Sequence, residues 1–181
     1  CGVVALIGAP NAGKSTLVNA IVGQKVAIVS PKVQTTRVRL TGVALEGDTQ
    51  MLLVDTPGIF QPRRRLDRAM VQNAWEGAAD ADVLLAIVDS RGGLRDEVRS
   101  VLETIATRTE PRWLVLNKVD ISDKGKLLEL AVAANEIAGF AETFMISALS
   151  GDGVADLKTA LAAKMPQGPW LFPEDQLSDA P

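Results

Sequence analysis

The 181-residue sequence contains no histidine, no tyrosine and a single cysteine, Cys1. The absence of histidine excludes catalytic triads built on an imidazole base and metal sites with histidine ligands. One cysteine excludes an intramolecular disulfide and is typical of a protein from the reducing cytosol. Catalysis or metal binding therefore has to use carboxylates, hydroxyls, lysines and backbone amides.

Long hydrophobic runs and an excess of positive charge are also absent. The longest apolar run, residues 83–88, lies between two aspartates and is far too short to cross a bilayer. The formal net charge is −3, so any RNA contact needs a local basic patch or a further segment. With 47% hydrophobic residues, the chain is long enough for one globular domain with a complete core. It begins without methionine directly before an apolar run, so we expect it to be part of a longer protein.

What is present is a regular alternation of apolar runs with segments of helical periodicity. We expect strands at residues 3–7, 51–55, 83–89, 113–117 and 143–146, and helices at residues 14–22, 66–79, 94–107, 126–137 and 154–164. The alternation predicts an α/β fold with three layers, in which helices cover a doubly wound, mainly parallel sheet. Residues 41–46 and 49–54 flank a Gly47-Asp48 turn, which predicts a hairpin and one antiparallel edge strand.

Further signals indicate where helices begin and where the domain ends. Ser122-Asp123 and Asp152-Gly153 favour helix starts. After residue 165 the composition shifts to proline and scattered aromatics. We therefore expect residues 1–165 to form the domain and residues 166–181 to form an extended linker that leaves it.

A glycine-rich segment joins the first expected strand to the first expected helix, and it reads Gly8-Ala9-Pro10-Asn11-Ala12-Gly13-Lys14-Ser15-Thr16. Glycines allow backbone amides to converge on phosphate oxygens, and the helix N-terminus adds its positive dipole. Lys14 can reach the terminal phosphates of a nucleotide, and Ser15 can ligate Mg²⁺. The segment predicts a nucleotide phosphate-binding site, and a turn that carries a lysine by accident is the weaker interpretation.

An aspartate ends the strand expected at residues 51–55 and begins the sequence Asp55-Thr56-Pro57-Gly58. An aspartate at the carboxyl end of a strand beside a phosphate site can hold Mg²⁺ through water, and the Gly58 amide can contact the terminal phosphate. In isolation this sequence is a common strand-ending turn. Downstream of the phosphate-binding segment, we favour the magnesium interpretation.

The strand expected at residues 113–117 leads into a third polar motif, Asn117-Lys118-Val119-Asp120. A carboxylate here can accept hydrogen bonds from N1–H and the exocyclic amine of guanine, which adenine cannot donate, and the Lys118 stem can cover the base. In isolation the motif would be an ordinary loop, but its place in the chain favours guanine selection by Asn117 and Asp120. A weaker signal is Ser147-Ala148-Leu149, where the Ala148 amide can meet the guanine O6.

With these elements in this order, the chain resembles the translation-factor-like class of P-loop GTPases over nearly its whole length. The strings G-x-P-N-x-G-K-S-T-L, Q-T-T-R, D-T-P-G-I, N-K-V-D and S-A-L-S-G, with the tail at residues 169–176, are similar to those of the Era family of ribosome-assembly GTPases. The resemblance implies a P-loop NTPase fold, GTP/GDP and Mg²⁺ as ligands, slow GTP hydrolysis, and a C-terminal RNA-binding KH domain outside this chain. It also implies binding of ribosomal RNA during small-subunit assembly, in the cytoplasm with loose contact to the inner face of the cell membrane.

The resemblance also assigns roles to the loops near the phosphates. Thr36, with Thr35 as the second choice, is expected to reach Mg²⁺ and the γ-phosphate. Residues 34–37 would then be switch I, and residues 58–68 switch II. Loops of this kind order or release with the γ-phosphate.

Two residues of these motifs bear on how water and ions are positioned. Ile59 stands where Ras-type enzymes carry the glutamine that orients the attacking water, and its side chain cannot hydrogen-bond to water. Backbone groups, a partner or an ion must then position that water. Asn11 resembles the asparagine that ligates K⁺ in some of these enzymes, and a role in shaping the loop is an equal alternative.

Other interpretations stay open at this point. A P-loop ATPase or small-molecule kinase is disfavoured by Asn117 and Asp120. An interaction module that binds nucleotide with negligible intrinsic hydrolysis is compatible with Ile59. A sister GTPase that acts on the large subunit or in tRNA modification shares the nucleotide motifs. The arginine run at residues 63–65, with Arg68, is more typical of a solvated face than of an RNA patch or an internal arginine finger.

Overall fold

The computed structural model describes residues 1–9, 12–22, 26–28, 39–55, 81–118, 120, 122–166, 168 and 177–179. Within these residues a six-stranded sheet has the strand order β3-β4-β1-β5-β6-β7. Its strands are β1 (Gly2–Gly8), β3 (Arg39–Glu46), β4 (Thr49–Asp55), β5 (Val83–Asp89), β6 (Arg112–Asn117) and β7 (Glu142–Met145). Neighbouring strands run parallel except for β3 and β4. The predicted mainly parallel sheet with one antiparallel edge strand is confirmed.

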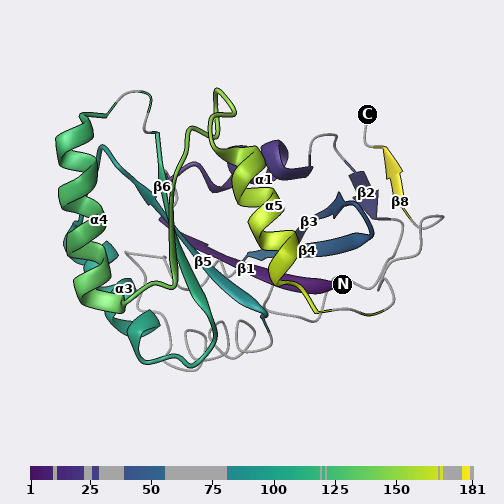
Figure 1. Ribbon diagram of the computed structural model, residues 1–181, viewed down its shortest axis with the longest axis horizontal. Coiled ribbons are helices and arrows are strands. Elements are labelled where there is room, and N and C mark those ends of the chain that lie inside the picture. Colours follow the sequence, from purple (N-terminus) through teal and green to yellow (C-terminus); the bar gives the residue numbers. More distant parts are fainter. Residues whose placement is uncertain are drawn as a thin grey trace.

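Helices cover both faces of this sheet, so the domain has three layers (Figure 1). On one face lie α1 (Lys14–Val22) and α5 (Val154–Lys164), and on the other lie α3 (Asp96–Ala106) and α4 (Lys124–Ala138). Both α1 and α5 have the expected bounds, whereas the helix expected at residues 66–79 lies outside the described residues. No helix in the described part of the chain is both long and apolar enough to cross a membrane.

Two helix starts follow from the residues that precede them. α4 begins two residues earlier than expected because Asp123 Oδ1 accepts hydrogen bonds from the backbone nitrogens of Gly125 and Lys126, at 2.8 and 3.4 Å. α5 begins after Gly153, which has a φ of 78° and provides no side-chain cap. A Cβ at this position would lie 2.9 Å from the carbonyl oxygen of Met145, so only glycine fits there.

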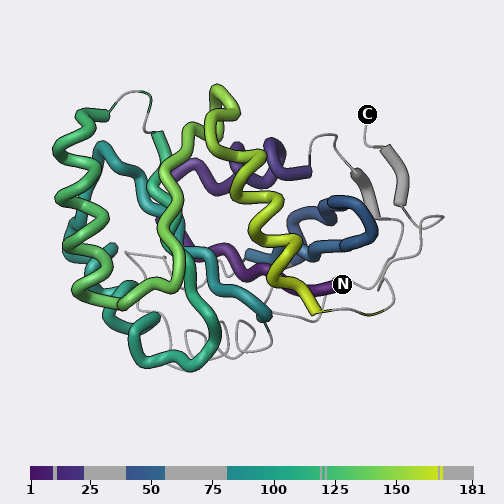
Figure 2. The backbone as a smooth tube through the Cα atoms, viewed as in Figure 1, coloured from purple at the N-terminus to yellow at the C-terminus, as the bar shows by residue number. Residues whose placement is uncertain are grey.

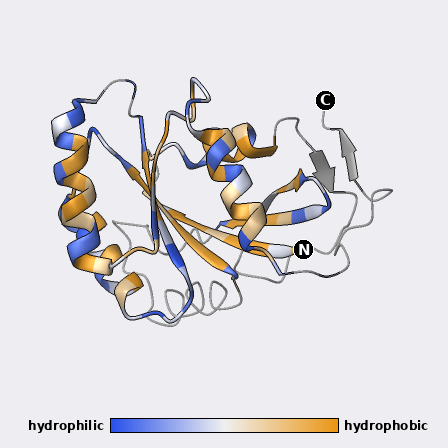
Figure 3. Ribbon diagram, in the orientation of Figure 1, coloured by the Kyte–Doolittle hydropathy of each residue, from blue (hydrophilic) through white to orange (hydrophobic). Residues whose placement is uncertain are grey.

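The central strands of the sheet are buried on both faces, and β1 contributes to both halves of the core. Val4 and Leu6 of β1 pack with α1 and α5, whereas Ala5 and Ile7 pack with α3 and α4, and each is at most 2% exposed. The hydrophobic colouring of the central strands in Figure 3 reflects this two-sided burial. A parallel strand covered on both faces reads as a continuous apolar run, which is why these strands could be predicted. The packed core fixes where each strand ends.

The remaining pairings join distant parts of the chain. The first residue lies beside the end of α5 (Figure 2), where the backbone nitrogen of Cys1 donates to the Pro166 carbonyl at 3.1 Å. A two-stranded antiparallel sheet joins β2 (Val26–Ile28) to β8 (Leu177–Asp179). These two strands were not predicted, because three residues carry no usable periodic signal. Part of the segment expected to be a linker therefore pairs with a strand that follows α1.

Candidate nucleotide-binding site

The carboxyl ends of β1, β4, β5 and β6 meet at one edge of the sheet. In the strand register, Leu6 of β1 is paired with Asp55, and Asp89 is paired with Asn117. Because these strands are parallel, the groups that follow them lie along the same edge, where Gly8 ends β1 and α1 begins. The fold therefore gathers the predicted phosphate, magnesium and guanine motifs at one place.

On the β4 side of this edge, Lys14 and Asp55 form an ion pair. The Lys14 Nζ lies 2.7 Å from Asp55 Oδ1 and 3.5 Å from the Gly8 carbonyl oxygen, and both charged side chains are more than four-fifths buried. A cavity of about 150 Å³ is lined by these two residues together with Ser15 and Thr41. The predicted phosphate-binding lysine therefore contacts the predicted magnesium aspartate directly, and this cavity is called the phosphate side below.

The oxygen groups of the phosphate side fit a magnesium ion that binds together with a nucleotide. Mg²⁺ prefers oxygen ligands, usually one or two from the protein and the rest from water and substrate phosphates. In the described ranges, no group of three or more Cys, Asp and Glu residues is placed to hold a metal. Ser15 and Asp55 line the phosphate side and carry oxygen groups of the kind that Mg²⁺ prefers, so the prediction that Ser15 ligates Mg²⁺ and that Asp55 holds it through water fits the residues present.

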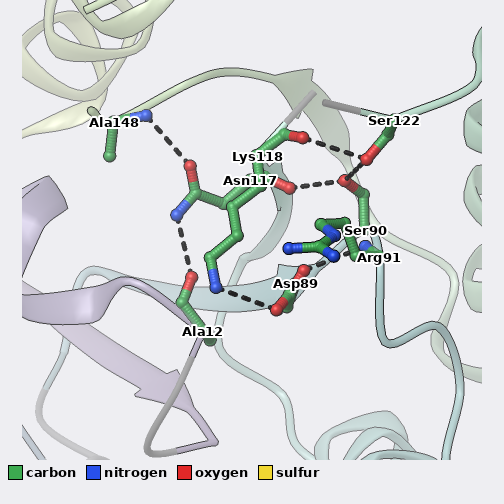
Figure 4. A network of polar contacts seen from close by, with 8 residues as sticks. All are labelled: Ala12, Asp89, Ser90, Arg91, Asn117, Lys118, Ser122 and Ala148. Atoms are coloured by element: carbon green, nitrogen blue, oxygen red, sulfur yellow. Dashed lines mark hydrogen bonds and ion pairs between the residues drawn. The ribbon is translucent and has the colours of Figure 1, made fainter. Parts of the chain in front are cut away.

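On the β6 side of the edge, Asn117 connects three loops. It is 2% exposed; its Nδ2 donates to the Ala12 carbonyl at 2.8 Å, and its Oδ1 accepts from the Ala148 nitrogen at 2.9 Å (Figure 4). Gly13 passes so close to this side chain, with φ at 91°, that a Cβ there would collide with Asn117 Nδ2. The Ala148 amide, expected at the guanine O6, is thus already bonded, and a base oxygen would share or replace that bond.

A cavity of about 270 Å³ opens beside Asn117, and this cavity is called the base side below. It is lined by Gly13, Thr16, Arg91, Asn117, Lys118, Asp120, Ser147, Ala148 and Leu149. All but one of these residues come from the motifs that were predicted to bind nucleotide. Arg91 was missed, and the signal that could have found it is its position two residues after the strand β5, at the same edge of the sheet.

Sequence reasoning also missed Asp89, which forms an ion pair with Lys118. The Lys118 Nζ lies 2.9 Å from Asp89 Oδ2, and the backbone nitrogen of Arg91 donates to Asp89 Oδ1 at 2.9 Å. Burial raises the pKa of Asp89, but the hydrogen bond and charge of Lys118 and the backbone amides of Arg91 and Gly92 together hold that pKa below its ordinary value. Asp89 is therefore a carboxylate at neutral pH, directed at the lysine of the guanine motif.

Comparison with known proteins now assigns the family. A family model described as 50S ribosome-binding GTPase matches residues 3–118. The chain belongs to this GTPase family. It is 60% identical over 181 residues to GTPase Era of Afipia carboxidovorans, an alignment that covers 100% of this chain and 59% of that relative. The chain thus spans less than two thirds of the length of the curated relatives that it matches.

Two solved structures of Era resemble this GTPase domain. Era in complex with MgGDPNP and nucleotides 1506–1542 of 16S ribosomal RNA has a TM-score of 0.79 and 36% identity, and the match covers 99% of this chain and 62% of that one. A tyrosine-to-alanine variant of Era from Aquifex aeolicus, bound to GDP·AlF4⁻, has a TM-score of 0.77, the same identity and the same coverage. These likenesses confirm the predicted resemblance to the Era family and the P-loop GTPase fold.

Several residues predicted for this GTPase site lie outside the described residues. They are Pro10, Asn11, Thr35, Thr36, Thr56, Pro57, Gly58 and Ile59, together with the arginine run at residues 63–65. The roles given to them in K⁺ binding, in the two switch segments and in water positioning stay predictions. The described part of the site consists of the phosphate side and the base side.

Proposed function

We propose that this chain is the GTP-binding and GTP-hydrolysing part of a molecular switch. The observation that carries the proposal is the set of bonds from Asn117 to Ala12 and Ala148, because it joins the phosphate-binding segment to both guanine motifs around one cavity. The neighbouring phosphate side holds Lys14, Ser15 and Asp55, which suit a polyphosphate with magnesium. The two cavities together support a bound guanine nucleotide with its phosphates at the start of α1.

Each residue of the site would then have a distinct task. Lys14 moves from Asp55 to the terminal phosphates and, with the backbone amides before α1, stabilises charge that develops on the transferred phosphoryl group. Asp120 accepts the two hydrogen bonds that guanine donates. Bound Mg²⁺ would supply neutralisation of the phosphate charges, held by Ser15 and Asp55. Ile59 offers no hydrogen bond to water, which supports a slow intrinsic rate, and Asn11 is proposed to hold K⁺.

Small-subunit assembly is the proposed setting for this switch. A relative of the same fold, Era, was crystallised with nucleotides 1506–1542 of 16S ribosomal RNA, which belongs to the small subunit. The chain spans 59% of its curated relatives, so the RNA contact is proposed to lie mainly in a C-terminal region beyond it, with peripheral membrane contact as a further prediction. Action on the large subunit is the second candidate, because the matching family model is described as 50S ribosome-binding.

The nucleotide proposal is tested by binding and hydrolysis on this chain. We expect GTP and GDP to bind on the order of 10⁴-fold more tightly than ATP and ADP, because adenine leaves the acceptors of Asp120 unpaired. We expect single-turnover GTP hydrolysis to be slow and faster in K⁺ than in Na⁺. Comparable binding of ATP would overturn the guanine assignment, and binding without measurable single-turnover hydrolysis would favour an interaction module.

The setting is tested on the intact protein. Binding to the small-subunit RNA segment that corresponds to nucleotides 1506–1542 of 16S ribosomal RNA is compared between the GDPNP-bound and GDP-bound states, with large-subunit RNA of equal length as the control. We expect tighter binding to the small-subunit segment in the GDPNP state. Preference for the large-subunit RNA would support the second candidate instead.

A further inference from the structure

Ser90, which directly follows β5, forms hydrogen bonds to the backbone of the loop that begins at Asn117. The backbone nitrogen and the Oγ of Ser90 both donate to the Asn117 carbonyl, at 3.0 and 2.6 Å. The Ser122 hydroxyl, next to the residue that caps α4, donates to the Lys118 carbonyl at 2.9 Å. Two successive carbonyls of the loop are therefore held by serine hydroxyls (Figure 4).

The two serine hydroxyls also contact each other. The Oγ atoms of Ser90 and Ser122 lie 2.6 Å apart, so their three close contacts share only two hydroxyl hydrogens. When Ser122 donates to Ser90 in place of the Lys118 carbonyl, Ser90 keeps its own hydrogen on the Asn117 carbonyl. The hydroxyls therefore act as a connected pair, and the loss of either one changes the bonding of the other.

Lys118 is held through its side chain as well as its backbone. Among the described residues it is the non-glycine residue with a positive φ, 66°, a conformation that persists where the surroundings fix it. Its Nζ donates to Asp89 Oδ2, while Asp89 Oδ1 accepts from the Arg91 nitrogen. Because the carboxylate is itself oriented, it fixes the course of the Lys118 side chain along the base side.

We propose that Asp89, Ser90 and Ser122 are positioning residues for nucleotide binding. They hold Lys118 so that the aliphatic part of its side chain packs against the face of the purine ring. The inference rests on the proposed guanine-nucleotide binding, and none of the three residues lines the base side itself. An aliphatic stem contacts the face of any purine alike, whereas Asp120 reads the edge of the base. Positioning by Asp89 is therefore expected to set affinity without setting base preference.

The first test removes the negative charge of Asp89 and keeps the size and shape of its side chain. In Asp89→Asn, the affinities for GDP and for IDP should fall by the same factor, about tenfold, mainly through faster dissociation. Asp82→Asn is the matched control, because Asp82 precedes β5 at its other end and its Oδ2 accepts from the Val3 nitrogen at 2.8 Å. This control should lose stability and keep its GDP affinity. Unchanged GDP affinity in Asp89→Asn, or unequal losses for GDP and IDP, would overturn the positioning role.

The second test asks whether Asp89 acts through Lys118. Lys118→Met keeps the apolar stem and removes the charge that Asp89 holds. In this background Asp89→Asn should cause no further loss of GDP affinity, because the contact between the two residues is already gone. A further tenfold loss would mean that Asp89 acts elsewhere. The double variant leaves no unpaired lysine charge, so this comparison can be made even where the single variant is unstable.

The serine pair is tested in the same assay. Ser90→Ala and Ser122→Ala should each lower GDP affinity by about fivefold, the effect of one hydrogen bond, and the double variant should lose less than the product of the two losses because the hydroxyls are coupled. Ser90→Thr keeps the hydroxyl and should restore binding. Additive losses in the double variant, or no recovery of binding in Ser90→Thr, would overturn the positioning role of Ser90 and Ser122. A wild-type chain that does not prefer GDP to ADP would instead contradict the proposed function, which separates the two failures.

Discussion

The base side and the phosphate side differ in what holds their groups in place. On the base side, Asn117 is bonded to Ala12 and Ala148, and these bonds lie within the protein and involve no ligand. On the phosphate side, Lys14 and Asp55 are paired at 2.7 Å, although the proposed function gives each of them another partner. The groups proposed to recognise guanine are therefore held in place by the fold itself, whereas the proposed phosphate and magnesium binding would require two charged groups to exchange partners.

The largest expected effect tests the base side alone. The Asp120 carboxylate is proposed to accept a hydrogen bond from the amine of guanine. In Asp120→Asn the amide can instead donate to the C2 carbonyl of xanthine. The ratio of GTP affinity to XTP affinity should therefore change on the order of 10⁴-fold, as measured by titration with both nucleotides. Asp123→Asn, which keeps a good helix cap on α4, is the control and should leave the ratio unchanged. An unchanged ratio in the Asp120 variant would contradict the guanine assignment.

The next largest effect tests whether the two sides are separate. Lys14→Met removes the donor that is proposed to stabilise phosphoryl charge, so the rate of single-turnover GTP hydrolysis should fall by about 10²- to 10³-fold. Binding of guanosine, which has no phosphate, should stay the same because the base side is assembled without Lys14. Lys126→Met, at an exposed position of α4, is the control for both measurements. Loss of guanosine binding in Lys14→Met would show that the sides depend on each other.

The structure of the sheet explains how much of the fold and of the site could be predicted from the sequence. Strands that are buried on both faces read as apolar runs, so their ends, and the polar motifs that follow them, could be located in advance. Parallel strands share one edge, which is why Gly8, Asp55 and Asn117 were expected together. The roles of Asp89 and Ser90 could not be predicted, because they depend on the register that pairs Asp89 with Asn117 across two strands. Nothing in a single strand indicates its register with the next.

A smaller effect concerns the stability that the base side contributes. Asn117→Ala would leave the buried Ala12 carbonyl and Ala148 amide without this partner, which should lower the free energy of unfolding by roughly 2–4 kcal/mol in urea titration. Asn135→Ala is the matched control, because Asn135 also joins two backbone groups, at Ala131 and Phe140, but lies at a half-buried position. That control should lose less stability and keep its GDP affinity. Equal losses of GDP affinity in both variants would mean that Asn117 only supports the fold.

The smallest effect is a pH dependence of the Asp89–Lys118 pair. The pKa of Asp89 is held below its ordinary value in the folded chain, so its stabilising contribution is present above the unfolded pKa and is lost as pH falls through the folded one. The difference in unfolding free energy between wild type and Asp89→Asn, roughly 0.2–1 kcal/mol, should be constant near neutrality and disappear in acid. Glu110→Gln is the control, because Glu110 also has a lowered pKa but lies in another ion pair. Burial raises the pKa of Glu110, and the hydrogen bond and charge of Arg108 outweigh this and hold it below its ordinary value. The stability difference between wild type and each variant should disappear as pH falls into the acid range, because it is the wild-type carboxylate that becomes protonated. Only Asp89→Asn should weaken GDP binding at pH 7. Weakened binding in Glu110→Gln would remove the distinction between positioning and stability.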